Sequence, residues 1–414
     1  MSTRAALRPF SDLLLSVCGV VLLLAAHSPA AAGPEPRSGD EGAALELHDY
    51  REPDRTVDGF PVWLGRDRVL DRVVVLVEGL DLFNRMDARG IMRMVSPVAD
   101  VLEAEGLDAL VVDFPDSHLA PDDLAPHLDR AIRSAAKAAG RPVIVAGLSG
   151  GGITARWALV AAEERGEPLP VSTLMLLDSP NRGAWLNPGL HALTTRFGTR
   201  EDRRAVESPG ARALITSFPT QVRWKRVGPP FARRKVPVAW TADSSGSEAF
   251  FARLHALNDR RGYPKQCRVI AVSQGARPSA PAADACPAPA QTPQQLFKMW
   301  LPFGASWSLR CEPEDSAAGS MLPVGMTARY RVRLPLGIAG SSLRRAPTFV
   351  SSVSSLDAAP GEEPPFDEWY ARAADLPRIG HDGADRGAIA FILAALRRAT
   401  QDPAPAPAAG FAAR

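Results

Sequence analysis

Five successive apolar residues, VVVLV at Val73–Val77, limit the possible folds more than any other segment of the chain. A continuous β-branched run of this kind is typical of a strand that is buried on both faces, as strands in parallel sheets are. Four other runs have the same character: Leu107–Val112, Val143–Ala146, Leu174–Leu177 and Arg268–Val272. Helical patterns alternate with them at Met92–Glu105, Pro121–Ala139 and Gly151–Arg165. The alternation predicts an α/β fold in which a mostly parallel central sheet carries helices on both faces.

The first 32 residues have the pattern of a secretory signal peptide. Arg4 and Arg8 precede an apolar run from Leu13 to Ala26, and small residues follow as far as Ala32. This run is shorter than the roughly 20 residues that a membrane-spanning helix needs, so a retained anchor is the less favoured alternative. We therefore predict cleavage near Ala32 and export, to the periplasm or by full secretion.

The remainder of the chain divides by composition. Residues 33–50 are rich in Pro, Gly and charged residues and are predicted to form a linker. Residues 401–414 read QDPAPAPAAGFAAR, and a segment so poor in large apolar side chains is predicted to be a disordered tail. One α/β domain is predicted between them, over residues 51–400.

Two stretches interrupt the alternating pattern of this domain, at about 185–265 and 277–345. The first contains one helical pattern at Ser245–Arg260, and the second is dominated by Pro, Ala and Gln with scattered aromatic residues. We predict that both are insertions that form a cap or lid over the carboxyl edge of the sheet. A last strand is predicted near Thr348–Ser354, and a last helix at Ala384–Arg398.

Charge and cysteine content exclude several classes of function. Lys and Arg number 48 against 46 Asp and Glu, so the formal net charge is only +2, and no nucleic-acid partner is expected. Export permits one disulfide among Cys267, Cys286 and Cys311, and the sequence does not choose the pair. No C-x-x-C spacing occurs, so no zinc site is expected, and neither is any other metal or cofactor.

The candidate chemistry centres on the turn Gly147-Leu148-Ser149-Gly150-Gly151, which lies between a predicted strand and a predicted helix. This is the G-x-S-x-G pattern in its strand–turn–helix setting, where the turn holds the serine hydroxyl above the sheet edge. Ser149 is therefore the predicted nucleophile. The Gly150 N–H at the helix N-terminus is a predicted oxyanion donor. The second predicted donor is the Leu80 N–H, from the loop that follows Val77.

The base and the acid are predicted from chain order, which in this arrangement runs Ser, acid, His. His381 lies in a loop before the last predicted helix and is the predicted base, whereas His255 and His191 fall in the first insertion. Asp178 directly follows the strand after the nucleophile and is the favoured acid. Asp357 and Asp284 remain open as alternatives.

These motifs resemble bacterial α/β-hydrolases related to lipases and to glycosylphosphatidylinositol inositol-deacylases. Four segments, in the order of the family, carry the resemblance: Val77–Asp81, Val112–Asp116, Gly147–Gly151 and Asp178–Ala184. The resemblance spans roughly residues 70–275, with weaker similarity at Phe349–Asp357 and at His381. It implies an α/β-hydrolase fold for the domain over residues 51–400, hydrolysis of carboxylic esters and no cofactor. Two departures stand out, because relatives often carry His-Gly where this chain has Glu78-Gly79, and a His where it has Asn181.

The leading hypothesis is an exported serine esterase or lipase that acts on a small-molecule or lipid ester. An acyltransferase with the same triad and a catalytically inactive binding module are the alternatives. A basic cluster in the first insertion favours transient contact with anionic lipid headgroups, although a solvated basic face explains it as well. Its members are Arg223, Lys225, Arg226, Arg233, Arg234 and Lys235. Aromatic residues of the insertions suit either an acyl chain or the core of the cap itself: Trp185, Phe250, Phe251, Trp300, Phe303 and Trp307.

Overall fold

The computed structural model describes most of the predicted α/β domain. The described residues are 50–81, 87–184, 195, 200–216, 218–219, 223–227, 234–239, 242–258, 262–276, 296–300, 306–310, 328–330, 341–343, 350, 352–358, 362–372 and 386–401. The predicted signal peptide, almost all of the linker and nearly the whole predicted tail lie outside these residues, so the predictions for them stay predictions.

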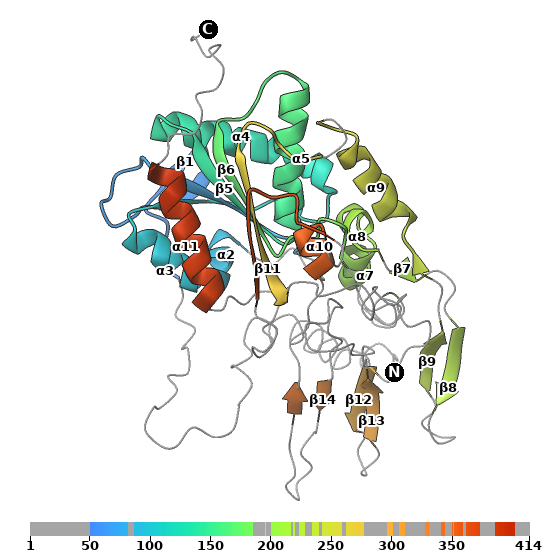
Figure 1. Cartoon of the computed structure of the whole chain (residues 1–414). Coiled ribbons are helices and arrows are strands. Elements are labelled where there is room, and N and C mark those ends of the chain that lie inside the picture. Colours follow the sequence, from blue (N-terminus) through green and yellow to red (C-terminus); the bar gives the residue numbers. More distant parts are fainter. Residues whose placement is uncertain are drawn as a thin grey trace, which may run out of the picture.

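A sheet of eight strands in the order β1-β2-β4-β3-β5-β6-β11-β16 forms the centre of the molecule (Figure 1). The strands are β1 (Arg55–Val57), β2 (Phe60–Trp63), β3 (Val73–Val77), β4 (Asp108–Val112), β5 (Val143–Leu148), β6 (Val171–Leu177), β11 (Arg268–Ala276) and β16 (Glu368–Arg372). Only β2 runs antiparallel to its neighbours, and the six strands from β4 to β16 are parallel. This order and the single reversed strand confirm the α/β-hydrolase fold.

The central strands lie where their sequences predict them. All five residues of β3 and all five of β4 are buried, as continuous apolar runs between two helical layers should be. The two N-terminal strands, β1 and β2, were not expected. Strand β1 is three residues long and largely exposed, so it carries no apolar run. Strand β2 is mostly buried, but its apolar run FPVW is only four residues long and contains a proline, which is rare within strands.

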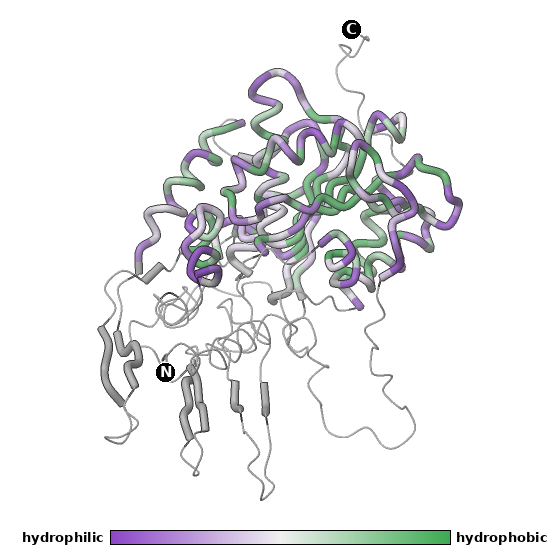
Figure 2. The backbone as a smooth tube through the Cα atoms, turned by 180° about the vertical axis from the view of Figure 1, so that it is seen from behind, coloured by the Kyte–Doolittle hydropathy of each residue, from purple (hydrophilic) through white to green (hydrophobic). Residues whose placement is uncertain are grey.

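Helices cover both faces of the sheet (Figure 1). On one face, α4 (Pro121–Ala139) and α5 (Gly150–Glu164) share a core with the strands. On the other, α2 (Ala88–Met94), α3 (Ser96–Ala104) and α11 (Arg386–Gln401) share a second core with them. Figure 2 shows the same layering, because hydrophobic residues are concentrated in the sheet and hydrophilic residues on the outer turns.

Helix ends follow local chemistry. The single helix predicted over Met92–Glu105 is two helices, because the chain breaks at Val95 and Pro97 lies in the first turn of α3, where a missing N–H costs nothing. Helix α4 begins at Pro121 as predicted and ends before Gly140, which adopts a left-handed conformation with φ 69°. None of the helices in the described part of the chain is long and apolar enough to cross a bilayer.

The predicted last strand, Thr348–Ser354, is wrong. Residues Ser352–Leu356 form a short helix, α10, and the last strand is β16, whose Glu368 pairs with Ile270 of β11. Serine side chains favour the helical turn, because Ser354 Oγ donates to Gly183 O at 2.7 Å and Ser355 Oγ donates to Ser273 Oγ at 2.6 Å. The first bond ties α10 to the loop after β6 and the second ties it to β11, although α10 is not part of the sheet.

The first insertion contributes two helices that pack on α5. Helix α8 (Pro209–Leu214) and helix α9 (Ser245–His255) form one apolar cluster with α5, which includes Leu214, Phe250 and Ile153. A further helix, α7, spans Arg200–Val206, and the insertion also holds the short strands β7 (Phe218–Pro219) and β10 (Ala242–Asp243) and the hairpin of β8 (Arg223–Val227) and β9 (Arg234–Ala239). The second insertion holds a separate sheet of β12 (Leu296–Trp300), β13 (Ser306–Arg310), β14 (Ala328–Tyr330) and β15 (Ser341–Leu343). That both insertions form a lid stays a prediction.

Candidate active site

The turn between β5 and α5 holds Ser149 in a backbone conformation that few residues adopt. Ser149 has φ 49° and ψ −123°, far outside the regions open to an ordinary L-residue. Two hydrogen bonds hold it there: its N–H donates to Leu177 O at 2.9 Å, and its carbonyl accepts the Gly152 N–H at 3.1 Å. Strain of this kind costs about 1–3 kcal/mol and is concentrated at functional sites. The side chain is half-buried at the carboxyl edge of the sheet.

Glycine is required on both sides of the serine because the backbone passes too close for a Cβ atom. A Cβ built on Gly147 would lie 2.3 Å from Gly152 Cα, and one built on Gly151 would lie 2.1 Å from the carbonyl oxygen of Glu78. In both cases the obstacle is backbone, which cannot move aside as a side chain can. The sharp turn from strand to helix therefore depends on these two positions.

Replacing Gly151 by Ala is expected to destabilise the protein by about 3 kcal/mol or more, because its Cβ would overlap the end of β3. Gly166→Ala is the matched control, since Gly166 has φ 73° but nothing within 4 Å of an added Cβ, and it should cost only about 1 kcal/mol. Urea denaturation of both variants measures the difference. Equal losses of stability would show that the close approach at Gly151 is not a constraint.

The two predicted oxyanion donors lie side by side. A Cβ built on Gly150 would lie 3.2 Å from the backbone nitrogen of Leu80, and one built on Gly79 would lie 3.2 Å from Ser149 Cβ. The loop after β3 thus runs directly along the serine turn, with Gly79 allowing the contact. The Gly150 N–H also opens the 15-residue helix α5, whose dipole favours negative charge at this end. The backbone nitrogen of Leu80 thus lies beside the turn that holds Ser149, and the role of the two N–H groups as oxyanion donors stays a prediction.

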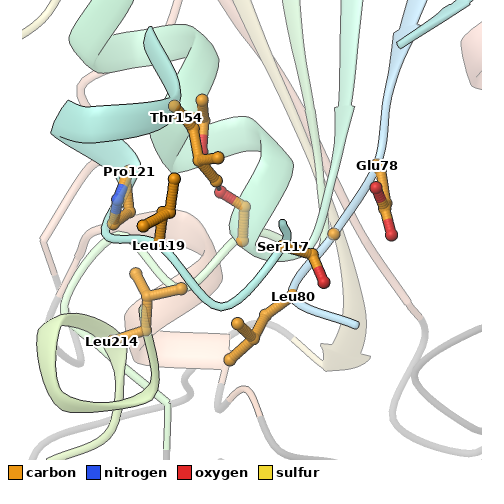
Figure 3. Close-up of a pocket in the computed structure, with 10 residues that line it drawn as sticks. Glu78, Leu80, Ser117, Leu119, Pro121, Thr154 and Leu214 are labelled. Carbon is orange, nitrogen blue, oxygen red and sulfur yellow. Dashed lines mark hydrogen bonds between the residues drawn. The ribbon is translucent and has the colours of Figure 1, made fainter. Parts of the chain in front are cut away.

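A small hollow opens beside these donors (Figure 3). Most of its wall is apolar, and it comes from the loops after β3 and β4, from α4 and α5, and from helix α8 of the first insertion. The lining residues are Glu78, Gly79, Leu80, Ser117, Leu119, Pro121, Leu124, Gly150, Thr154 and Leu214.

Asp178 follows β6 and lies next to the serine turn. The residue before it, Leu177, accepts the Ser149 N–H, and the Asp178 N–H itself donates to Val272 O at 2.8 Å. Asp178 is buried and has φ 46°, which directs it out of the strand at the carboxyl edge of the sheet. The structure therefore brings this predicted acid to the same edge and to the neighbouring strand of the predicted nucleophile.

Asp357, the second candidate acid, is held by other partners. Its Oδ1 accepts a hydrogen bond from Arg182 Nε at 2.7 Å, and its Oδ2 accepts one from the Tyr263 hydroxyl at 2.7 Å. Arg182 also donates to the carbonyl oxygen of Asp357 at 2.9 Å. Both carboxylate oxygens are thus engaged in a structural contact. The third candidate, Asp284, lies outside the described residues.

The predicted base, His381, also lies outside the described residues. In the sequence it falls within residues 373–385, which connect strand β16 to helix α11. His255, by contrast, is on helix α9 of the first insertion, where burial and the nearby Arg156 lower its pKa. The catalytic role of His381, like those of Ser149, Asp178, Leu80 and Gly150, stays a prediction.

Asn181, predicted to replace a His of the resembling family, is bound to a buried arginine. Arg156 of α5 is fully buried, and its Nη1 donates to Asn181 Oδ1 at 3.3 Å. Asn181 Nδ2 in turn donates to Ser355 O at 2.9 Å, and the guanidinium lies 3.5 Å from the ring centroid of Tyr263. Asn181 therefore joins α5 to α10. An arginine within a helical pattern is normally exposed, so the sequence gives no signal of this network.

The structure describes most of the basic cluster and one of the three cysteines. Arg223, Lys225 and Arg226 lie on β8, and Arg234 and Lys235 lie on β9, so that one hairpin carries five of the six basic residues. Cys267 is a free thiol whose pKa is raised, chiefly by burial, whereas Cys286 and Cys311 lie outside the described residues. The disulfide prediction is therefore not decided.

No protein-family model and no curated protein matches the chain. Among solved structures, it is similar to the mature form of the lipase BlEst2 from Bacillus licheniformis, with 16% identity and a TM-score of 0.33 over 53% of this chain and 73% of that one. Est1E from Butyrivibrio proteoclasticus gives 14% identity and a TM-score of 0.27, covering 53% and 75%. Lipase B from Aspergillus fumigatus gives 15% and 0.24, covering 44% and 45%.

These neighbours are lipases and esterases, but at such identities and scores the similarity adds nothing about chemistry. The strand order of the sheet and the sharp serine turn at its carboxyl edge carry the structural assignment on their own. On that basis the chain has the α/β-hydrolase fold.

Proposed function

We propose that the protein is an exported serine hydrolase that cleaves carboxylic esters through an acyl-enzyme on Ser149. The observation that carries the proposal is the strained backbone of Ser149 at the start of α5, with the loop that contains Gly79 and Leu80 running along the same turn. A serine held in this way at a helix N-terminus suits nucleophilic attack on a carbonyl, once a base takes its proton and backbone N–H groups bind the oxyanion.

The proposed reaction has two halves. Ser149 Oγ attacks the ester carbonyl while His381 takes the hydroxyl proton, and the Leu80 and Gly150 N–H groups hold the oxyanion. The intermediate collapses to an acyl-enzyme, and His381 returns the proton to the departing alcohol. Water then attacks the acyl group by the same route and releases the acid. Asp178 holds the imidazole in the productive tautomer and stabilises its protonated form.

Export rests on the N-terminal pattern, and the relation to glycosylphosphatidylinositol inositol-deacylases rests on the four shared motifs. The hairpin of β8 and β9, with its five basic residues, supports transient contact with an anionic membrane surface. The ester is accordingly a small molecule or a lipid.

Hydrolysis of p-nitrophenyl esters from acetate to palmitate by the full chain tests the proposal. Turnover that is absent from a Ser149→Ala preparation is the expected result, and the preferred chain length separates an esterase from a lipase. Adding an alcohol acceptor and measuring the new ester reveals acyl transfer if it occurs. A folded protein that turns over none of these esters would favour the binding-module alternative.

A further inference from the structure

Two side-chain hydrogen bonds hold the loop that carries the Leu80 N–H. The Phe114 N–H, from the segment after β4, donates to Glu78 Oε2 at 2.9 Å. Three residues further along the same segment, Ser117 Oγ donates to Asp81 O at 2.8 Å. The two bonds attach the loop just before and just after Leu80. The segment after β4 thus fixes the loop at both ends.

Glu78 itself is held at its backbone as well. Its N–H donates to Val112 O at 3.2 Å, and its carbonyl oxygen is the atom that an added Cβ on Gly151 would meet at 2.1 Å. A shift of Glu78 would therefore change both the loop after β3 and the start of α5. Its carboxyl is buried, with 2% of the residue exposed.

We propose that Glu78 is a positioning residue for the oxyanion-binding N–H of Leu80, and that it acts as a neutral carboxylic acid. This inference rests on the proposed function, since it assigns a role only if Leu80 binds an oxyanion. It also accounts for the departure from His-Gly at this place in the chain. A protonated carboxyl still accepts the Phe114 N–H through its carbonyl oxygen.

Burial and two acidic neighbours favour the neutral form of the Glu78 carboxyl. Figure 3 shows the Glu78 side chain on the side of β3 away from Leu119, Pro121 and Thr154, so the carboxyl does not open into the apolar part of the hollow. The two charged groups that act on it are Asp113, after β4, and Asp81, in its own loop, and both are acidic. Burial is the largest effect and raises the pKa of Glu78 to about 8. The two carboxylates add to this rise, and the hydrogen bond from the Phe114 N–H opposes it.

A negative charge on Glu78 would oppose catalysis. Glu78 is only two residues from Leu80, so their Cα atoms are at most about 7 Å apart. An ionised carboxylate on this loop would repel the negative charge that develops on the substrate oxygen. Ionisation would also add a negative charge near Asp81 and Asp113, which repel it. Activity should therefore fall as Glu78 loses its proton.

The pH dependence of kcat, measured on the full chain with p-nitrophenyl butyrate, tests the proposal. The wild type should lose activity above pH 8 and lie about 30-fold below its plateau at pH 9.5, as expected for loss of one proton. Glu78→Gln keeps an acceptor for the Phe114 N–H and cannot ionise, so its profile should stay flat over this range. The spontaneous hydrolysis seen with Ser149→Ala is subtracted.

Asp108→Asn is the matched control. Asp108 is also a fully buried carboxyl that accepts backbone N–H groups, from Gly65 at 3.0 Å and Asp71 at 3.1 Å, but it lies at the opposite end of β4. This variant should keep the alkaline loss of activity. If Glu78→Gln keeps it too, or if Asp108→Asn removes it equally, the proposal is overturned.

A second pair of variants tests the positioning itself. Glu78→Leu and Ser117→Ala each remove one of the two loop bonds, and each should lower kcat at pH 7 by about 10-fold with little change in KM, because the lost contact acts on the transition state. Glu78→Gln should restore most of the loss seen in Glu78→Leu. Changes in KM alone would contradict the proposal. A wild type without esterase activity would instead overturn the proposed function.

Discussion

Ester hydrolysis by the Ser149→Ala variant should fall by about 10⁶-fold, to the level set by binding and the oxyanion donors alone. His381→Ala should lose nearly as much, because the hydroxyl is a weak nucleophile without a base. The double variant should be no worse than either single one, since residues that act as a unit have non-additive effects. Initial rates with a short-chain p-nitrophenyl ester measure all three.

The strained backbone at Ser149 should lower the stability of the protein. Ser149→Gly removes the strain of the positive φ, so this inactive variant should be more stable than the wild type by about 1 kcal/mol. Ser149→Ala keeps a Cβ in the same conformation and should show little change. Urea denaturation measures both variants. A Ser149→Ala variant that retains full activity would refute Ser149 as the nucleophile.

The second large effect concerns the acid. Asp178→Asn should lower kcat by about 10⁴-fold with the fold intact, because an amide favours the wrong tautomer of the base. Asp357→Asn should leave kcat within about 3-fold, since its carboxylate is engaged by Arg182 and Tyr263, and it should instead reduce thermal stability. Kinetics and thermal melts of the two variants separate these roles.

The reverse result would reassign the acid. If Asp357→Asn abolished turnover while Asp178→Asn remained active, Asp357 would be the acid and its contact with Arg182 would be part of the site. If both variants kept their activity, Asp284 would be the remaining candidate for the acid.

The sequence predicts the central strands well because their burial is uniform. Strands β3 and β4 are buried at every position, so that their apolar runs are unbroken. Strands β1 and β16 have exposed or half-buried residues, and their sequences RTV and EWYAR carry no such run. The misplaced last strand has the same origin, because the apolar residues near Val350 are followed by serines whose hydroxyls bind β11 and Gly183.

The candidate site is predictable to the extent that it is local. The serine turn and its glycines are five adjacent residues, and Leu80 follows from the loop after the first buried strand. The bond from the Phe114 N–H to the Glu78 carboxyl joins residues 36 positions apart, and the contact of Arg156 with Asn181 spans 25. Pairings between distant residues leave no periodic pattern, so only the structure reveals them.

Labelling of the full chain with a fluorophosphonate, followed by mass spectrometry of its peptides, tests the central claim most directly. The reagent bonds covalently only to a serine whose oxygen is activated. The predicted result is one adduct per chain, on Ser149, that Asp178→Asn slows and Ser149→Ala abolishes. No adduct on a folded protein, or an adduct on another serine, would contradict the assignment of Ser149 as the nucleophile of an ester hydrolase.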